Sequence, residues 1–419
     1  MQYFSNWFVY NPYTKWLLGY VFRGLKSIFG DSLPLRRPNL IIAYPKRIMK
    51  ISKCHLSLLV TILSLSSYGQ FRKYSNEFLN IGAGARGLAM GSAQVASVED
   101  GTAGYWNPAG LVGVKDHPNL NLMHSEYFAG IGKYDYASIA FPVQNNKRVI
   151  GISALRFAVD DIMNTLFLVE PDGSINYNNI QSFSSADYAF IFSFAQKLRE
   201  RENEHIQFGI NAKVIHRSVG KFAKAWGFGL DGGLQVTEGK WKFGVAARDI
   251  TTTFNAWSFS FTDEEKQALY LTKNDIPVKS TEMTAPRLII GAARDFKISN
   301  KVSLLAEANF DVTFDGKRNT VISSDPISID PKLGVELNIN HIFYVRGGIN
   351  NFQKALADAD TLNQKKVWIY QPSIGAGFKI QNITIDYAFA NLANQSNPLF
   401  THVFSLKLDL ISDKNKKKK

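Results

Sequence analysis

Cysteine and long apolar runs are both scarce in this chain of 419 residues. The longest apolar run, residues 56–65, is about half of the ~20 residues that a membrane-spanning helix needs, which argues against a helical membrane protein. The single cysteine, Cys54, precedes that run. Without residues 1–69 the chain has no cysteine, which excludes disulfide scaffolds, thiolate metal sites and cysteine nucleophiles. The histidines after residue 69 lack the spacing of a zinc site: His117, His124, His205, His216, His341 and His402.

An excess of one charge is missing from the body of the chain. The formal net charge is +13, but residues 1–69 hold nine Lys or Arg and one Asp, and residues 411–419 hold five Lys and one Asp. A nucleic-acid-binding protein is expected to carry its basic residues as a face on the fold. We therefore exclude nucleic acid as a partner and expect residues 411–419 to be a solvated lysine-rich tail.

Residues 49–69 have the organisation of a secretory signal peptide. A basic stretch from Met49 precedes the apolar run, and small residues lead to an expected cut near Gly69 or Gln70. Because a signal should be N-terminal, we expect Met49 to be the start and residues 1–48 to be a mis-called or extra extension. The alternative is a genuine extension, with an interfacial amphipathic segment around residues 16–29.

Short segments with alternating apolar and polar residues recur after residue 118. Near the C-terminus, Phe404, Leu406 and Leu408 alternate with polar residues, which is typical of strands. We predict fourteen strands: 119–130, 134–143, 148–160, 185–198, 205–220, 225–237, 241–250, 287–297, 302–312, 328–340, 342–351, 371–380, 383–391 and 399–410.

The lengths of the connections distinguish two all-β folds that alternation alone leaves open. The apolar face is the core in a soluble sandwich but faces lipid in a transmembrane barrel. All long connections here fall at one end: 161–184, 251–286, 313–327, 352–370 and 392–398. Short periplasmic turns and longer outer loops are typical of outer-membrane barrels. We predict a fourteen-stranded antiparallel transmembrane β-barrel over residues 119–410, in contact with outer-membrane lipid, with the 411–419 tail in the periplasm.

Residues 70–118 are rich in Gly and Ala and show no alternation. The segment is too small to form its own core, so we predict a hatch that packs inside the barrel. Its first glycines fit the G-x-G-x-x-G dinucleotide pattern, but the strand and βαβ unit that this pattern requires are missing. We therefore expect no cofactor, and predict that packing needs these hatch residues: Gly82, Gly84, Arg86, Gly87, Gly91, Asn107, Pro108, Ala109 and Gly110.

Charged residues on the predicted inward face of three strands form a second candidate site. Glu307 and Asp311 lie on the segment 302–312, Glu336 on 328–340 and Arg346 on 342–351. Paired carboxylates can do acid–base chemistry. Because Arg346 is expected close enough to neutralise them, we predict a charge network in the lumen rather than catalysis, and no metal site.

Aromatic residues are dense at the start of the predicted outer loop 251–286. They favour a surface that contacts a partner, but their alternation also fits an extended strand with an aromatic girdle. Both interpretations stay open for Phe254, Trp257, Phe259 and Phe261.

Residues 78–93 and 95–110 resemble the start of the PorV/PorQ family, which belongs to the FadL-like superfamily of outer-membrane barrels. The triplet Asn107-Pro108-Ala109 after a Gly/Ala-rich lead carries the resemblance, whereas residues 82–87 depart from PorV itself and favour a paralogue. The resemblance implies a fourteen-stranded barrel with a hatch, a place in the type IX secretion system of Bacteroidota, and no covalent chemistry. It also implies translocon or attachment-complex partners and secreted cargo, which binds through its C-terminal domain.

We therefore predict a non-enzymatic outer-membrane barrel that binds cargo or translocon partners through residues 251–286 and 352–370. The alternative is a FadL-type channel for hydrophobic small molecules. A continuous apolar pocket from the loops to the hatch would favour the channel, and a lumen filled with charge would favour the secretion component. A barrel enzyme ranks last, because no catalytic set of residues is visible.

Overall fold

The computed structural model describes residues 70–71, 75–170, 172–356, 366–391 and 400–411. All of them belong to one compact unit, residues 67–419. The predicted extension 1–48, the signal peptide 49–69 and all but the first residue of the tail 411–419 lie outside the described residues. No helix among the described residues has the length and apolarity to cross a membrane.

Strands account for most of the described chain. The N-terminal segment instead contains short elements: β1 (Gln70–Phe71), η1 (Glu77–Asn80), α4 (Ala85–Ala89), α5 (Ala103–Trp106) and η2 (Pro108–Gly113). The strands that follow are β2 (Asn119–Tyr127), β3 (Gly132–Val143), β4 (Arg148–Asn164), β5 (Gln181–Arg201), β6 (Glu204–Val219), β7 (Ala223–Glu238), β8 (Trp241–Arg248), β9 (Thr253–Phe259), β10 (Ser280–Thr284), β11 (Arg287–Lys297), β12 (Val302–Thr313), β13 (Ile322–Ser323), β14 (Ser328–Ile339), β15 (Phe343–Leu356), β16 (Lys366–Ile380), β17 (Ile383–Ala390) and β18 (Thr401–Asp409). Two further helices, η3 (Tyr177–Asn179) and α6 (Asp263–Leu271), lie in connections.

The sheet closes on itself because the last strand pairs with the first strand of the wall. β18 runs antiparallel to β2, with His402 opposite Glu126 and Asp409 opposite Asn119. β8 and β9 are two parts of one wall strand, since β7 pairs with both, and β10 and β11 together form its neighbour. The prediction of a fourteen-stranded antiparallel barrel with an N-terminal hatch is thus confirmed.

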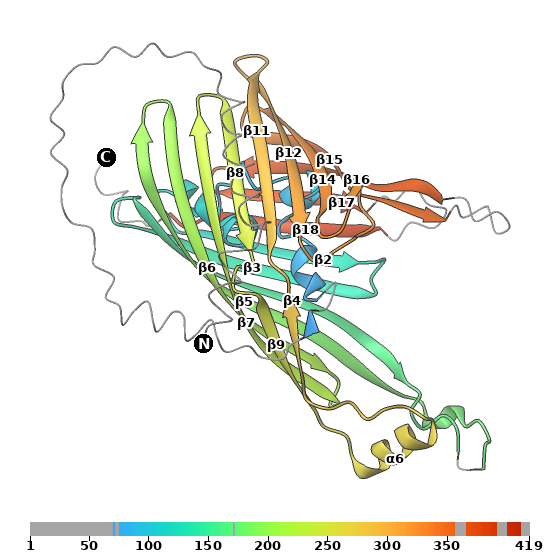
Figure 1. Cartoon of the computed structure of the whole chain (residues 1–419). Helices are drawn as coiled ribbons and strands as arrows, with labels where there is room; N and C mark the ends of the chain where they lie inside the picture. The colour runs from blue at the N-terminus through green and yellow to red at the C-terminus, as the bar shows by residue number, and fades with distance from the viewer. Residues whose placement is uncertain (1–69, 72–74, 171, 357–365, 392–399, 412–419) are drawn as a thin grey trace, which may run out of the picture. The chain divides into compact units, whose positions relative to one another are not determined.

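The predicted outer loop 251–286 is wrong over part of its length, because the wall continues through it. β9 and β10 are antiparallel partners within this segment, and α6 lies between them at the far end of β9 (Figure 1). The strand is interrupted where Asp249 and Thr252 adopt positive φ, which breaks the period of two at residues 249–252. A capping box formed by Thr262 and Glu265 starts α6.

The two ends of the barrel differ in their connections. We call the end with residues 128–131, 165–180, 220–222, 260–279 and 314–327, at which β15 and β17 also end, the loop end. The opposite end, with residues 144–147, 202–203, 239–240, 298–301, 340–342 and 381–382, is the turn end. The predicted separation of long and short connections therefore holds, with shorter loops than expected where strands extend beyond the predicted limits.

The outer face of the wall is apolar. On β4, Ile150 and Ile152 are 47% and 45% exposed, whereas Ser153 of the same strand faces the hatch and is 2% exposed. The same alternation places Phe190 and Phe192 outward on the neighbouring strand β5. Closure pairs the backbone groups around the ring, so the wall combines a satisfied ladder with an apolar exterior, as lipid requires.

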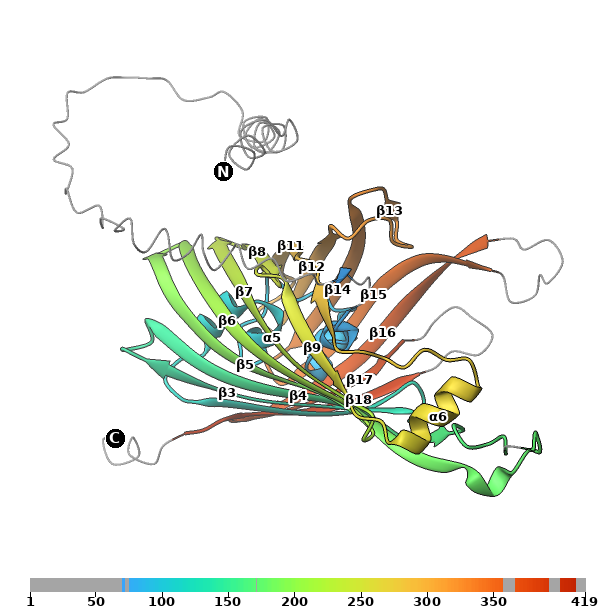
Figure 2. The same cartoon turned by 60° about the horizontal axis from the view of Figure 1, so that its bottom comes forward.

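The main apolar core lies inside the barrel, between the hatch and the wall. The helices of the hatch are enclosed by the strands (Figure 2). Trp106 and Leu111 of the hatch share a cluster with Tyr134, Leu155 and Ile191 of the wall. The hatch can thus be buried without a core of its own, because the inward apolar residues of β3–β5 supply the other half.

Candidate functional site

The glycines at the start of the hatch allow close packing. Gly82 and Gly84 have positive φ in the turn before α4, while Arg86 and Gly87 belong to α4 itself. A Cβ on Gly87 would lie 2.6 Å from the ring of Trp106, whose Nε1 donates to the Ala83 carbonyl at 2.8 Å. α4 is short and follows η1 rather than a strand, so the environment of a dinucleotide-binding turn is not formed.

Gly91 brings the chain after α4 against the wall. Its φ is +59°, and a Cβ there would lie 2.6 Å from the backbone nitrogen of Ile349 on β15. Gly348 beside it is equally restricted, because its Cβ would lie 2.1 Å from the Gly91 nitrogen. These two glycines on separate elements therefore allow direct contact between hatch and wall backbones.

Asn107 joins the hatch to another part of the wall. It is fully buried, and its Nδ2 donates to the Val95 carbonyl at 2.9 Å and to the Leu234 carbonyl of β7 at 3.2 Å. Its Oδ1 accepts from the Ala109 nitrogen at 3.2 Å and caps η2, which starts at Pro108. Gly110 leaves no room for a side chain, since a Cβ would be 2.3 Å from the Val98 carbonyl oxygen. The sequence Asn107–Gly110 thus acts in the structure as a cap and a tight contact.

A buried charge network fixes α4 to three strands. Arg86 Nε and Arg346 Nε donate to the same oxygen of Glu336, at 2.8 and 2.6 Å. Arg346 Nη1 also donates to Asp386 of β17 at 2.7 Å. Arg346 is only 4% exposed, so every charge in this group depends on its partners.

Glu307 and Asp311 bind other groups than Arg346. Glu307 accepts a hydrogen bond from the Ala96 nitrogen of the hatch at 2.8 Å. Asp311 lies 3.1 Å from Lys332 Nζ and 3.3 Å from Arg287 Nε. The predicted charged residues therefore belong to the lumen, but of the three carboxylates only Glu336 contacts Arg346.

A second ion pair holds the middle of the hatch. Lys407 Nζ of β18 lies 3.3 Å from Asp100 Oδ2, and the Thr102 hydroxyl donates to Asp100 Oδ1 at 2.5 Å. Burial raises the pKa of Asp100, but the Lys407 ammonium, the bonds from Thr102 and the charge of Arg86 outweigh it and hold the pKa below its ordinary value. Asp100 therefore remains ionised in the lumen.

Above the hatch, at the loop end, lies a cavity of about 560 Å³ that we call the vestibule. One part of its lining is formed by apolar and aromatic side chains: Phe78, Ile81, Leu88, Tyr127, Phe128 and Phe157. Another part is charged: Glu77, Asp187, Arg217, Arg287, Asp311, Arg318, Asp330 and Lys332. The volume suits a small ligand, and the lining suits one with both an apolar and a polar part.

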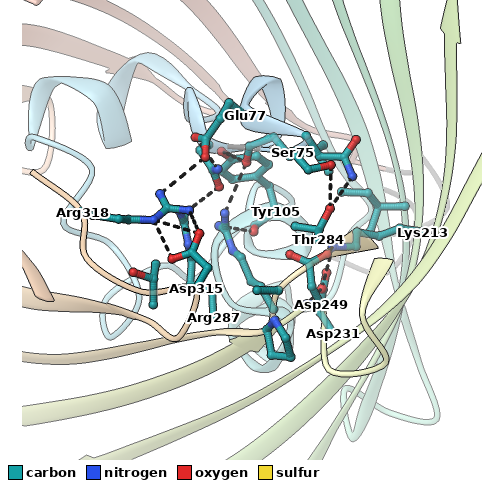
Figure 3. A pocket seen from close by; sticks show the side chains of 18 residues that line it. Ser75, Glu77, Tyr105, Lys213, Asp231, Asp249, Thr284, Arg287, Asp315 and Arg318 are labelled. Atoms are coloured by element: carbon teal, nitrogen blue, oxygen red, sulfur yellow. Dashed lines mark hydrogen bonds and ion pairs between the residues drawn. The ribbon is translucent and has the colours of Figure 1, made fainter. Parts of the chain in front are cut away.

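A smaller hollow of about 30 Å³ beside the vestibule has room for only about two waters. Figure 3 shows the ion pairs around it, with Arg318 directed at both Asp315 and Glu77. Arg318 Nη2 lies 2.6 Å from Asp315, and its Nη1 lies 3.6 Å from Glu77. Burial raises the pKa of Asp315, but its bonds to Arg318 hold it below the ordinary value. The rim of the vestibule is thus tied to the hatch.

The predicted aromatic residues lie on both faces of β9. Phe254 points outward and is exposed, whereas Trp257 Nε1 donates to Glu282 at 2.9 Å and its ring lies 5.2 Å from the Arg217 guanidinium. Phe259 stacks beside Trp257, with centroids 6.3 Å apart. Phe261 follows the strand and stacks on Phe222. The structure therefore distributes these four residues between the wall and its rim.

Sequence reasoning missed a third buried charge cluster. Lys213 Nζ lies 2.7 Å from Asp231 and 2.6 Å from Asp249, where the wall strand is interrupted between β8 and β9. Alternation in the segments 205–220 and 225–237 places Lys213 and Asp231 on the inward face, which could have identified them. Among the described residues, no group of three or more His, Cys, Asp and Glu could hold a metal ion.

No family model and no curated protein matches the chain. Solved structures with a similar fold include the monoaromatic hydrocarbon channel CymD, with a TM-score of 0.49, 12% identity, and coverage of 79% of this chain and 98% of the other. The toluene transporter TbuX of Ralstonia pickettii gives a TM-score of 0.48 and 12% identity, and covers 79% and 99%. A FadL homologue of Pseudomonas aeruginosa gives 0.41 and 12%, and covers 78% and 98%.

Proposed function

We propose that the chain is an outer-membrane barrel that binds small amphipathic molecules in the vestibule and passes them across the hatch. The observation that carries this proposal is the 560 Å³ cavity directly above the hatch. The apolar exterior and closed ladder support a position in a membrane. This is a channel of the general FadL type, with no covalent step.

The lining of the vestibule restricts the ligand. Phe78 and Phe157 provide apolar contact, while Arg217 and Arg287 provide donors for a polar or anionic group. The charged lumen below, around Arg346, gives no continuous apolar path, which by the criterion above favours the secretion component over a channel for pure hydrocarbons. The proposed ligand is therefore an amphiphile rather than a pure hydrocarbon.

A fluorescent amphiphile tests this proposal. Dansylaminoundecanoate would be titrated into the full chain in lipid nanodiscs, with empty nanodiscs as the background. Ala390→Trp fills the vestibule from β17 and should weaken binding by about tenfold, or ~1.4 kcal/mol. Ile385→Trp is the matched control, because Ile385 lies on the outward face of the same strand. Equal binding by both variants would remove the vestibule as the site.

A second candidate function is the PorV/PorQ-like role in type IX secretion. The observation that favours it is exposed apolar surface beyond the wall at the loop end: Tyr270 and Val278 are each 77% exposed. Surfaces of this kind mark contacts with proteins. Replacing residues 263–278 with a Gly/Ser linker should abolish co-purification of secretion partners while leaving dansylaminoundecanoate binding intact. If the channel function holds, Ala390→Trp should instead weaken dansylaminoundecanoate binding and leave co-purification of secretion partners unchanged.

A further inference from the structure

The lipid-facing wall contains a hollow of about 690 Å³ over β11, β12, β14 and β15. These strands lie side by side in Figure 1. The floor is made of small outward residues: Ala292, Ala306, Ala308 and Gly347. Larger apolar side chains surround it: Trp241, Phe296, Leu333, Val335 and Ile349. The hollow is therefore a recess in the apolar exterior, on the other side of the wall from the vestibule.

Arg294 lies at the edge of this hollow nearest the turn end. β11 runs toward the turn at residues 298–301, so Arg294 is about 10 Å from the end of the strand. Its guanidinium lies 4.9 Å from the ring of Trp241 and 5.0 Å from that of Phe296. Across the described part of the chain, no carboxylate lies within ion-pair distance of Arg294, and Asp295 beside it pairs with Lys242.

The surrounding charges at this edge are mostly positive. Lys240, Lys297 and Lys301 are exposed in or beside the adjacent turns. A second hollow of about 590 Å³ on the outer wall offers a contrast, because its Arg156 pairs with Asp135 at 3.1 Å. Of these two hollows, the one at Arg294 therefore combines an apolar recess with a cation that no described carboxylate pairs with.

We propose that this hollow binds a phospholipid, with the phosphate on Arg294 and an acyl chain over the small residues. A guanidinium can donate two parallel hydrogen bonds to phosphate oxygens, and the two rings hold its plane in place. Basic and aromatic residues commonly meet headgroups at the membrane interface. The site requires the barrel to lie in a bilayer, but it is independent of what the vestibule binds.

Native mass spectrometry of the full chain tests the site. The protein would be delipidated in detergent, supplied with dioleoyl phosphatidylglycerol, and scored for the fraction that retains one lipid. Arg294→Gln should lower this fraction about fivefold by removing the charge-assisted bonds, and Arg294→Lys should keep at least about half of it. The double variant A306L/A308L fills the recess and should also lower retention.

The second hollow supplies matched controls. Arg156→Gln and Ala137→Leu alter that hollow and should leave the fraction of protein that retains one lipid unchanged. Heat-dependent migration on gels would establish that each variant is a folded barrel. If Arg294→Gln does not fold, A306L/A308L still tests the contact with the acyl chain. Equal retention by Arg294→Gln and Arg156→Gln would overturn the proposal, as would equal retention of dioleoylglycerol, which has no phosphate. A dimer that forms as lipid is lost would assign the hollow to a second copy and overturn it too.

Discussion

At the scale of single residues, Arg346 is the central group of the buried charge network that holds the hatch to the wall. It joins Glu336 and Asp386 while almost fully buried, so its loss leaves Asp386 without its guanidinium partner. Breaking a buried pair typically costs about 3–5 kcal/mol, whereas an exposed pair contributes up to ~1 kcal/mol. We expect Arg346→Met to destabilise the barrel by the larger amount. Urea unfolding in lipid vesicles, followed by tryptophan fluorescence, measures the change.

Arg156→Met is the control at this scale, because Arg156 pairs with Asp135 on the exposed outer face. It should change the free energy of unfolding by no more than ~1 kcal/mol. If the two variants unfold at the same urea concentration, Arg346 does not hold the hatch in the way the contacts imply.

Part of this charge network could be predicted from the sequence. Glu336 and Arg346 are direct cross-strand neighbours, and the period of two places both on the inward face. The bond from Arg86 to Glu336 could not be predicted, because the hatch has no period that fixes the direction of a side chain. For the same reason the partner of Glu307, a hatch backbone nitrogen, was not identified. The partners of Asp311, Lys332 and Arg287, lie on wall strands whose alternation places them inward, so these pairs could have been predicted.

At the scale of elements, the hatch depends on the ionised carboxylate of Asp100. The pKa of this group is lowered in the folded chain, so its stabilising contribution is present above the unfolded value of about 4 and is lost as pH falls through the folded value. We expect the difference in thermal stability between the wild type and Asp100→Asn to be largest near pH 7. It should shrink as the pH falls through the folded value of Asp100, because both side chains are then neutral.

Thermal unfolding of both proteins across pH 2.5–7 provides the measurement. Asp100→Asn keeps the shape of the side chain and its contact with Thr102, so the pH dependence isolates the charge that faces Lys407. Parallel curves for the two proteins over the whole range would contradict the assignment.

The wall strand that is interrupted between β8 and β9 shows where prediction of elements failed. We predicted a connection over residues 251–286, although the alternation of its first aromatic residues also fitted an extended strand. The structure continues the strand because Lys213 and Asp231 hold Asp249, and the Thr253 hydroxyl donates to the same carboxylate. Such a tertiary contact is invisible in a local pattern. The strands with unbroken alternation, such as 302–312 and 383–391, were predicted to within one or two residues.

At the scale of the whole molecule, the alternation that predicted the strands did not decide whether their apolar face packs in a protein core or contacts lipid. The choice depended on the connections, and the closed sheet agrees with it: β18 pairs with β2, and the hatch occupies the inside. The interior already holds one core, formed by the hatch and the inward apolar residues. The outward residues, such as Phe192 and Ile210, are therefore a second apolar surface with no protein partner among the described residues.

This second surface leads to a prediction for the intact chain. Large outward apolar side chains recur on strands around the whole wall, and soluble monomers rarely expose contiguous apolar surface of this kind, so the chain should need an amphiphile to stay dispersed. We expect a monodisperse species in dodecyl maltoside, and aggregation when the detergent is removed by adsorption. Adding lipid vesicles during removal should instead give a protease-resistant barrel in the bilayer, with the loops at residues 165–180 and 260–279 cleavable from one side only. A chain that remained monodisperse in plain buffer would show that another surface covers the band, and would overturn the membrane assignment on which both the vestibule and the phospholipid site depend.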